Sequence, residues 1–247
     1  MKKFKIIPVI DILNSEVVHA VKGEREKYKP LKSVVVKSSE PVEIVKEIQK
    51  KTSLNDVYIA DLDAILRRKP NFSLLRNILN IPQIKVMIDP GIVSLENVLE
   101  YSKYELDSLI LGLETIKNLK VISDCLEIIG SNKTIVSIDM YKETIQTNVK
   151  EIKNQNPVKI IKKIEDLGAK LIILLDLYKV GQKLGGISPL YLEIKSLFNG
   201  QVLVGGGIRN FEDIELYIQN GFSGVLIGTA LHDGTIKLEK LRKLNLN

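Results

Sequence analysis

Two stretches of the chain, residues 88–101 and 204–217, repeat each other. In each stretch, the end of an apolar run is followed by a turn containing glycine and then by a helical pattern. The shared glycines, Gly91 and Gly207, are 207 − 91 = 116 residues apart. Self-similarity at a fixed spacing indicates stacked copies of one supersecondary unit. The repeat therefore restricts the fold to architectures with two similar halves.

Other strand ends match in the same order. Three further pairs correspond: Gly112 with Gly228, Asp61 with Asp176, and Asp11 with Asp139. The hairpin-like stretches 15–19 and 142–146 follow the last pair. Because the matches keep one order, they predict two (βα)₄ half-barrels rather than a chance resemblance.

Apolar runs and helical patterns alternate along the whole chain. Predicted strands are Lys5–Asp11, Asp56–Asp61, Ile84–Ile88, Ser108–Leu111, Thr134–Asp139, Lys170–Leu175, Gln201–Val204 and Gly224–Ile227. Predicted helices are Pro41–Lys50, Phe72–Leu79, Ser94–Tyr101, Lys117–Ile129, Pro157–Leu167, Pro189–Phe198 and Phe211–Gln219. Continuous apolar runs are typical of parallel strands buried on both faces. With 247 residues, we expect one (β/α)₈ TIM-barrel domain over 1–247, of the α/β class.

Composition excludes several classes of protein. The net charge of +6 comes from Lys and Arg interspersed with Asp and Glu, so we expect no nucleic-acid partner. One cysteine, Cys125, and two histidines argue against a metal site, and no motif indicates a cofactor. No apolar run reaches membrane-spanning length, and the N-terminus leads into a strand. We expect a cytoplasmic protein, and nothing indicates a protein partner.

Two glycine turns near the end of the chain form a candidate phosphate site. Gly205, Gly206, Gly207 and Arg209 follow one strand, and Gly228-Thr229 follows the next. Glycines allow backbone N–H groups to converge on an anion, and barrels bind phosphate after strands 7 and 8. A lone triple glycine is more often only a turn, but this pair predicts a small phosphorylated metabolite as ligand.

Four aspartates end predicted strands. Asp11, Asp61, Asp139 and Asp176 close the first, second, fifth and sixth strands. Since the first and fifth strands of an eight-stranded barrel are opposed, Asp11 and Asp139 can act on one substrate as base and acid. The alternative is that these aspartates hold loops through backbone N–H groups.

Five strings resemble a known family: Ile6–Asp11, Ala60–Asp63, Val136–Asp139, Gly205–Ile208 and Ile227–Leu231. Over essentially the whole chain they are similar to the histidine-biosynthesis barrels, which comprise a ribotide isomerase and its sister cyclase. Pro8 favours the isomerase. The resemblance implies an Amadori rearrangement of an aminoaldose to an aminoketose, with Asp11 as base and Asp139 as acid. It further implies substrate contacts for Asp61, Asp176, His19 and Gln182; His19 stands where the family has Arg or Lys.

The sequence also departs from this family. Asp89-Pro90 replaces the Gly205-Gly206 pattern in the first half, and Leu113-Glu114 replaces Thr229-Ala230. Proline lacks a donor and the carboxylates repel phosphate, so we expect one phosphate site instead of two. Two alternatives outside histidine synthesis stay open: a phospholigand-binding barrel without catalysis, and a synthase or lyase of archaeal-type cofactor biosynthesis.

Overall fold

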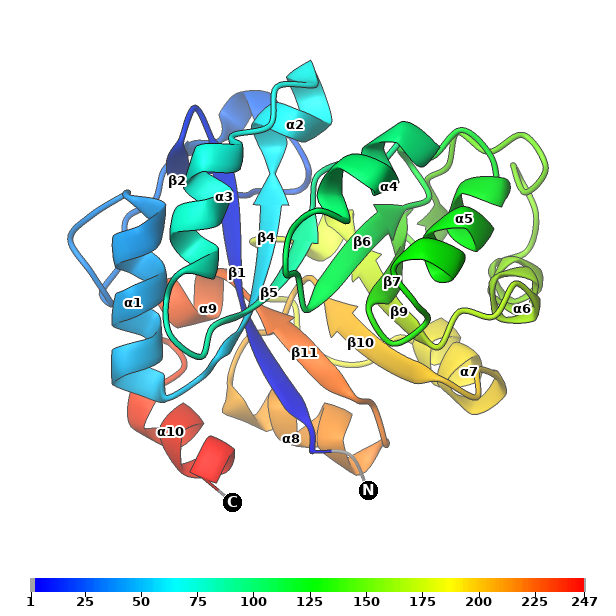
Figure 1. Ribbon diagram of the computed structural model, residues 1–247. Coiled ribbons are helices and arrows are strands. Elements are labelled where there is room, and N and C mark those ends of the chain that lie inside the picture. The colour runs from blue at the N-terminus through cyan, green and yellow to red at the C-terminus, as the bar shows by residue number, and fades with distance from the viewer. Residues whose placement is uncertain (1–2, 247) are drawn as a thin grey trace.

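Eight parallel strands form a closed barrel in the computed structural model, which describes residues 3–246 (Figure 1). The strands are β1 (Lys5–Leu13), β4 (Asp56–Asp61), β5 (Lys85–Asp89), β6 (Ser108–Gly112), β7 (Thr134–Tyr141), β9 (Leu171–Asp176), β10 (Gln201–Gly205) and β11 (Gly224–Ile227). The barrel closes because β11 pairs with β1 from Lys5↔Gly224 to Pro8↔Ile227. The predicted (β/α)₈ barrel is confirmed.

Helices cover the outside of the barrel (Figure 1). The connecting helices are α1 (Pro41–Thr52), α3 (Phe72–Leu79), α4 (Leu95–Tyr101), α5 (Lys120–Ile128), α6 (Pro157–Asp166), α7 (Pro189–Leu197) and α8 (Phe211–Gln219). All seven were predicted, with ends shifted by three residues at most. Prolines begin α1, α6 and α7, where the first helical position needs no N–H donor. None of the described helices is long and apolar enough to span a membrane.

Several short elements complete the chain. They are α2 (Leu62–Arg67), α9 (Thr229–His232), α10 (Leu238–Leu246) and the 3₁₀ turns η1 (Arg25–Lys27) and η2 (Leu177–Lys179). The helices α2 and α10 were not predicted. The last helix, α10, packs against α1 (Figure 1).

Each half-barrel begins with a strand that turns back as a hairpin. In the first half, the strand β2 (Glu16–His19) pairs antiparallel with β1 and also with β3 (Lys29–Pro30). In the second half, β8 (Thr144–Ile145) pairs antiparallel with β7. Both predicted hairpins are thus present. The first one matters most for the site, because it brings His19 over the end of the barrel.

The repeat extends to individual backbone hydrogen bonds. After β6, the N–H groups of Thr115 and Ile116 donate to the Gly112 carbonyl at 3.0 and 3.2 Å. After β11, Leu231 and His232 donate to the Gly228 carbonyl at the same two distances. The same turn at the same offset shows that the halves share one backbone design.

Side chains form two apolar layers. Alternate strand residues, including Ile7, Tyr58, Ile110 and Leu226, fill the barrel interior. The residues between them, such as Ile59, pack against the helices. This period of two decides which side chains at the strand ends enter the barrel. Burying each such side chain contributes about 1.5–3 kcal/mol.

Candidate active site

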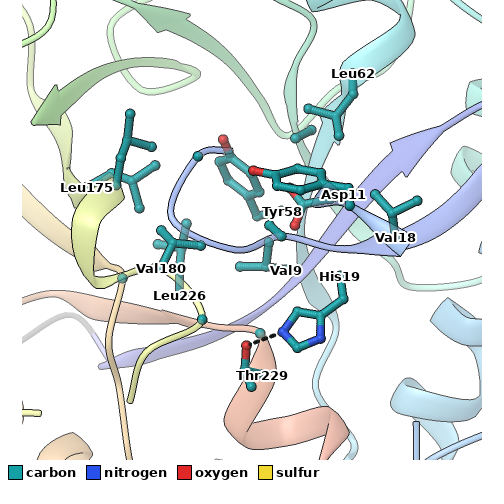
Figure 2. A pocket seen from close by; sticks show the side chains of 18 of the residues that line it. Val9, Asp11, Val18, His19, Tyr58, Leu62, Leu175, Val180, Leu226 and Thr229 are labelled. Atoms are coloured by element: carbon teal, nitrogen blue, oxygen red, sulfur yellow. Dashed lines mark hydrogen bonds between the residues drawn. The ribbon is translucent and has the colours of Figure 1, made fainter. Parts of the chain in front are cut away.

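A cavity of about 310 Å³ opens at the carboxyl ends of the barrel strands. Figure 2 shows its wall, with Tyr58 and Asp11 on one side and His19 and Thr229 on the other. The volume lies at the lower end of the range for small-molecule sites. In a barrel the strand ends and following loops form the catalytic face, so this cavity is the candidate active site.

Asp11 and Asp139 both line this cavity. They come from β1 and β7, which are separated by three strands on each side of the closed sheet. Asp139 is only 5% exposed, and the Ser137 hydroxyl donates to its Oδ1 at 2.8 Å. A Cβ at Gly112 would lie 3.5 Å from Asp139 Oδ2, so the neighbouring glycine leaves room for this carboxylate. The two carboxylates therefore face one enclosed space from opposite strands.

Tyr58 lies among the carboxylates at the floor of the cavity. Its hydroxyl donates to Asp89 Oδ2 at 3.2 Å. Burial raises the pKa of Tyr58 well above its usual range, and the charges of Asp89, Asp139 and Asp11 raise it further. The phenol is consequently protonated at neutral pH and acts as a hydrogen-bond donor to Asp89.

The opposite end of the cavity carries the glycine turns. Gly206 and Gly207 have φ angles of +87° and +85°, which side chains rarely adopt, and both line the cavity with Gly228 and Thr229. His19 Nε2 lies 3.0 Å from the Thr229 hydroxyl (Figure 2). The hairpin β1–β2 is thereby joined to the start of α9.

Two lysines, Lys32 and Lys183, also line the cavity. Lys183 pairs with Asp233 at 2.6 Å, and its Nζ lies 3.0 Å from the Thr235 hydroxyl. This links the loop after β9 to the segment after α9. Lys32 and the Lys183–Asp233 ion pair thus line the cavity together with the glycine turns.

His232 lines the same end and is buried. Burial lowers the pKa of its imidazole to about 4. Nδ1 lies 3.0 Å from the Ser33 hydroxyl. At neutral pH the ring is uncharged, so it adds a polar wall without a full charge.

Loops from the two halves meet at the cavity. The Lys22 N–H donates to the Val180 carbonyl at 3.0 Å. A Cβ at Gly181 would lie 2.9 Å from the Ala20 carbonyl oxygen, so only glycine permits this approach. Both loops contribute to the lining of the cavity.

Seven of the residues singled out in the sequence line this cavity: Asp11, His19, Asp139, Gly206, Gly207, Gly228 and Thr229. Five others do not line it: Asp61, Asp176, Gln182, Gly205 and Arg209. Arg209 instead contacts Asp213, through its backbone N–H at 2.8 Å and its guanidinium at 3.4 Å. The Gln182 N–H donates to the Lys179 carbonyl within its own loop.

Asp61 and Asp176 depart from the expected placement for a common reason. Asp61 accepts the Ala64 N–H at 2.9 Å and caps α2. Asp176 accepts the N–H groups of Tyr178 and Lys142 at 3.1 and 3.3 Å. Each follows an inward-facing strand residue, so the alternation of the strand turns it away from the cavity. The capping role that sequence reasoning weighed as the alternative describes both.

Sequence reasoning placed Asp89 and Glu114 against a phosphate in the first half, and both line the cavity, but it did not select four other lining residues: Lys32, Tyr58, Lys183 and His232. Strand alternation carries a signal for Tyr58 and also supports Asp89. Tyr58 and Asp89 have the same parity along their strands as the inward-facing Ala60 and Met87. The lysines come from loops whose path depends on contacts distant in sequence. Within residues 3–246, no group of three or more His, Cys, Asp or Glu side chains is arranged to hold a metal ion.

The chain was compared with known proteins. The family model described as histidine biosynthesis protein matches residues 5–237. The chain belongs to this family. A 1-(5-phosphoribosyl)-substituted imidazole-4-carboxamide isomerase of Lactococcus lactis, whose name contains two phosphoribosyl groups, is 29% identical over 96% of this chain and 97% of its own.

Methanocaldococcus jannaschii has two similar proteins. One is an uncharacterized protein, 35% identical over 96% of this chain and 97% of its own length. The other is named as the imidazole-4-carboxamide isomerase and is 28% identical over 98% and 99%. The chain therefore resembles the named isomerases over nearly its whole length and is a divergent member of their family.

Proposed function

We propose that this protein isomerises a phosphorylated aminoaldose to the corresponding aminoketose, with Asp11 as the base and Asp139 as the acid. The observation that carries the proposal is the placement of two carboxylates from opposed strands in one cavity whose other end consists of glycine turns. An acid and a base on two sides of a small sugar are what a proton shift between adjacent carbons requires.

The glycine turns are proposed to hold the phosphate. Among the described residues, the N–H groups of Gly207 and Ile208 have no intramolecular acceptor, so both are available to an anion. The Thr229 hydroxyl is a further donor, and Lys32 and Lys183, the latter paired with Asp233, line the same cavity. Converging N–H groups with nearby cations favour a phosphate dianion.

The proposed chemistry proceeds in two proton exchanges. Asp139 protonates the ring oxygen, the C1–O bond breaks, and the nitrogen lone pair forms a C1=N⁺ bond. Asp11 then takes the C2 proton, and the electrons of that bond form C1=C2 and neutralise the nitrogen. The C2 hydroxyl returns a proton to Asp139 while Asp11 delivers one to C1, so both carboxyl groups regain their starting states.

The comparisons support an isomerase without identifying its substrate. The named relatives act, by their names, on a molecule with two phosphoribosyl groups. The chain shares more identity with the second M. jannaschii protein than with that organism's named isomerase. We therefore propose a phosphorylated ribotide or sugar as substrate, outside the step that the named isomerases perform.

Hydrogen exchange tests the chemistry. The wild-type protein is incubated in D₂O with the 5-phosphoribosylamine formed from ribose 5-phosphate and an aromatic amine, and with the substrate of the named isomerases. We expect aminoketose carrying solvent deuterium at C1 from the 5-phosphoribosylamine and none from the substrate of the named isomerases. Asp11→Asn should reduce this rate roughly 10²–10⁴-fold, as for loss of a general base. A wild-type rate in Asp11→Asn, with the protein folded, contradicts the assigned base.

A further inference from the structure

We propose that Asp89 and Glu114 exclude phosphate from the first-half end of the cavity, so that the substrate carries a single phosphate group. This inference rests on the proposed function, because it assumes that the second-half turns hold that phosphate. We call residues 89–91 and 112–114 the first-half turns, and residues 205–207 and 228–230 the second-half turns. The two pairs occupy matching places in the repeat.

Asp89 removes the donor that a phosphate needs in the first half. Its Oδ1 accepts the Gly91 N–H at 3.0 Å. Gly91 matches Gly207, whose N–H has no acceptor among the described residues. Pro90, which lies between Asp89 and Gly91, has no N–H group. The first of these turns therefore offers an anion neither of the donors present at the matching glycines.

The second of the first-half turns, residues 112–114, also lacks the donors of its second-half counterpart. The Leu113 N–H donates to the Ser137 carbonyl at 3.1 Å. The matching bond, from Thr229 to the Val9 carbonyl, does not occur in the part of the chain that the structure describes. Leu113 also supplies a buried apolar side chain where the second half has a hydroxyl. A phosphate here would meet neither the N–H nor the hydroxyl that Thr229 has at the matching position.

Charge acts in the same direction. Asp89 and Glu114 both line the cavity, and Tyr58 donates to the Asp89 carboxylate from the interior. Arg68 is near this end, but it donates to the Gly91 carbonyl at 2.6 Å and does not line the cavity. Like charges a few ångströms apart repel strongly in a partly buried site. A second phosphate would lose donors and gain repulsion together.

Titration calorimetry with two sugar phosphates measures the preference of the protein for one phosphate group over two. Ribose 5-phosphate and ribose 1,5-bisphosphate differ only in the second phosphate. We expect the wild-type protein to bind the monophosphate at least as tightly as the bisphosphate. Asp89→Asn combined with Glu114→Gln keeps the shapes and the acceptor for Gly91 while removing both charges. This variant should bind the bisphosphate at least tenfold more tightly and the monophosphate within threefold of wild type.

A matched variant controls for net charge. Glu127→Gln with Glu193→Gln removes two carboxylates from the outer helices α5 and α7, and should leave both affinities within twofold. An unchanged affinity ratio in Asp89→Asn/Glu114→Gln, or a wild-type preference of tenfold or more for the bisphosphate, overturns the inference. Ribose 5-phosphate binding that Gly207→Ala does not weaken contradicts the proposed phosphate site, and the inference with it.

Discussion

The two halves of this barrel share a backbone and differ in what that backbone offers a ligand. After β6 and after β11, the same pair of N–H groups donates to a glycine carbonyl at the same distances. In the first half, the Gly91 N–H donates to Asp89 and the Leu113 N–H donates to the Ser137 carbonyl. In the second half, glycines and Thr229 leave donors for a ligand. A few side chains thus change the ligand chemistry of a repeat without altering its fold.

The largest expected effect is on the pH dependence of stability, and it comes from His232, whose counterpart in the first half is the apolar Ile116. Its pKa is lowered to about 4 from 6.5 by burial, with His19 and Asp233 as the charged neighbours. The unfolded chain therefore binds this proton at higher pH than the folded one. Stability is fully present above pH 6.5 and is lost as pH falls towards 4, by about 2 kcal/mol between pH 7 and 5.

Urea unfolding at these two pH values checks this expectation. His232→Ile, which introduces the first-half residue, should remove about 2 kcal/mol of the pH dependence and leave the part that other groups contribute. An equal fall in wild type and variant contradicts the buried neutral imidazole.

Gly207 and Gly91 provide a matched pair with a smaller expected effect. Both have positive φ, and a Cβ at either would lie 3.0 Å from a neighbouring carbon. Alanine should therefore destabilise both variants to a similar degree, roughly 1–3 kcal/mol. Only Gly207→Ala should weaken ribose 5-phosphate binding, at least tenfold, in a titration calorimeter. Equal weakening by Gly91→Ala is evidence that the halves are not distinct in ligand binding.

Tyr58 is expected to have the smallest effect. Its counterpart in the second half, Ile173, is apolar and buried. Tyr58→Phe removes one donor from Asp89, which keeps the Gly91 N–H, and should cost about 1 kcal/mol of unfolding free energy. Monophosphate affinity should change less than twofold. A tenfold change places Tyr58 in contact with the ligand instead.

The barrel could be predicted from the sequence because it depends on local patterns. Apolar runs of strand length, helical periodicity and a repeat at 116 residues are all visible without contacts. The six-residue α2 is too short for a periodicity and depends on the Asp61 cap. In contrast, α10 has leucines at helical spacing, Leu238, Leu241 and Leu244, so its sequence does carry a helical signal.

The candidate site was predictable only in part. Asp11 and Asp139 have the parity of the barrel interior, whereas Asp61 and Asp176 have the opposite parity, so strand alternation separates the two pairs. Applied to β4, the same rule would have selected Tyr58, and applied to β5 it places Asp89 inward. The Lys183–Asp233 pair and the Lys22–Val180 bond join segments 50 and more residues apart. No local pattern records such contacts.

A crystal soaked with ribose 5-phosphate tests the central claim most directly, because it locates the phosphate in the repeat. The account predicts phosphate density beside residues 206–209 and 228–230, within hydrogen-bonding distance of the Gly207 N–H and the Thr229 hydroxyl, and none at the first-half turns. Phosphate density of equal strength beside Asp89, Pro90 and Gly91 would contradict the account and favour a substrate with two phosphates.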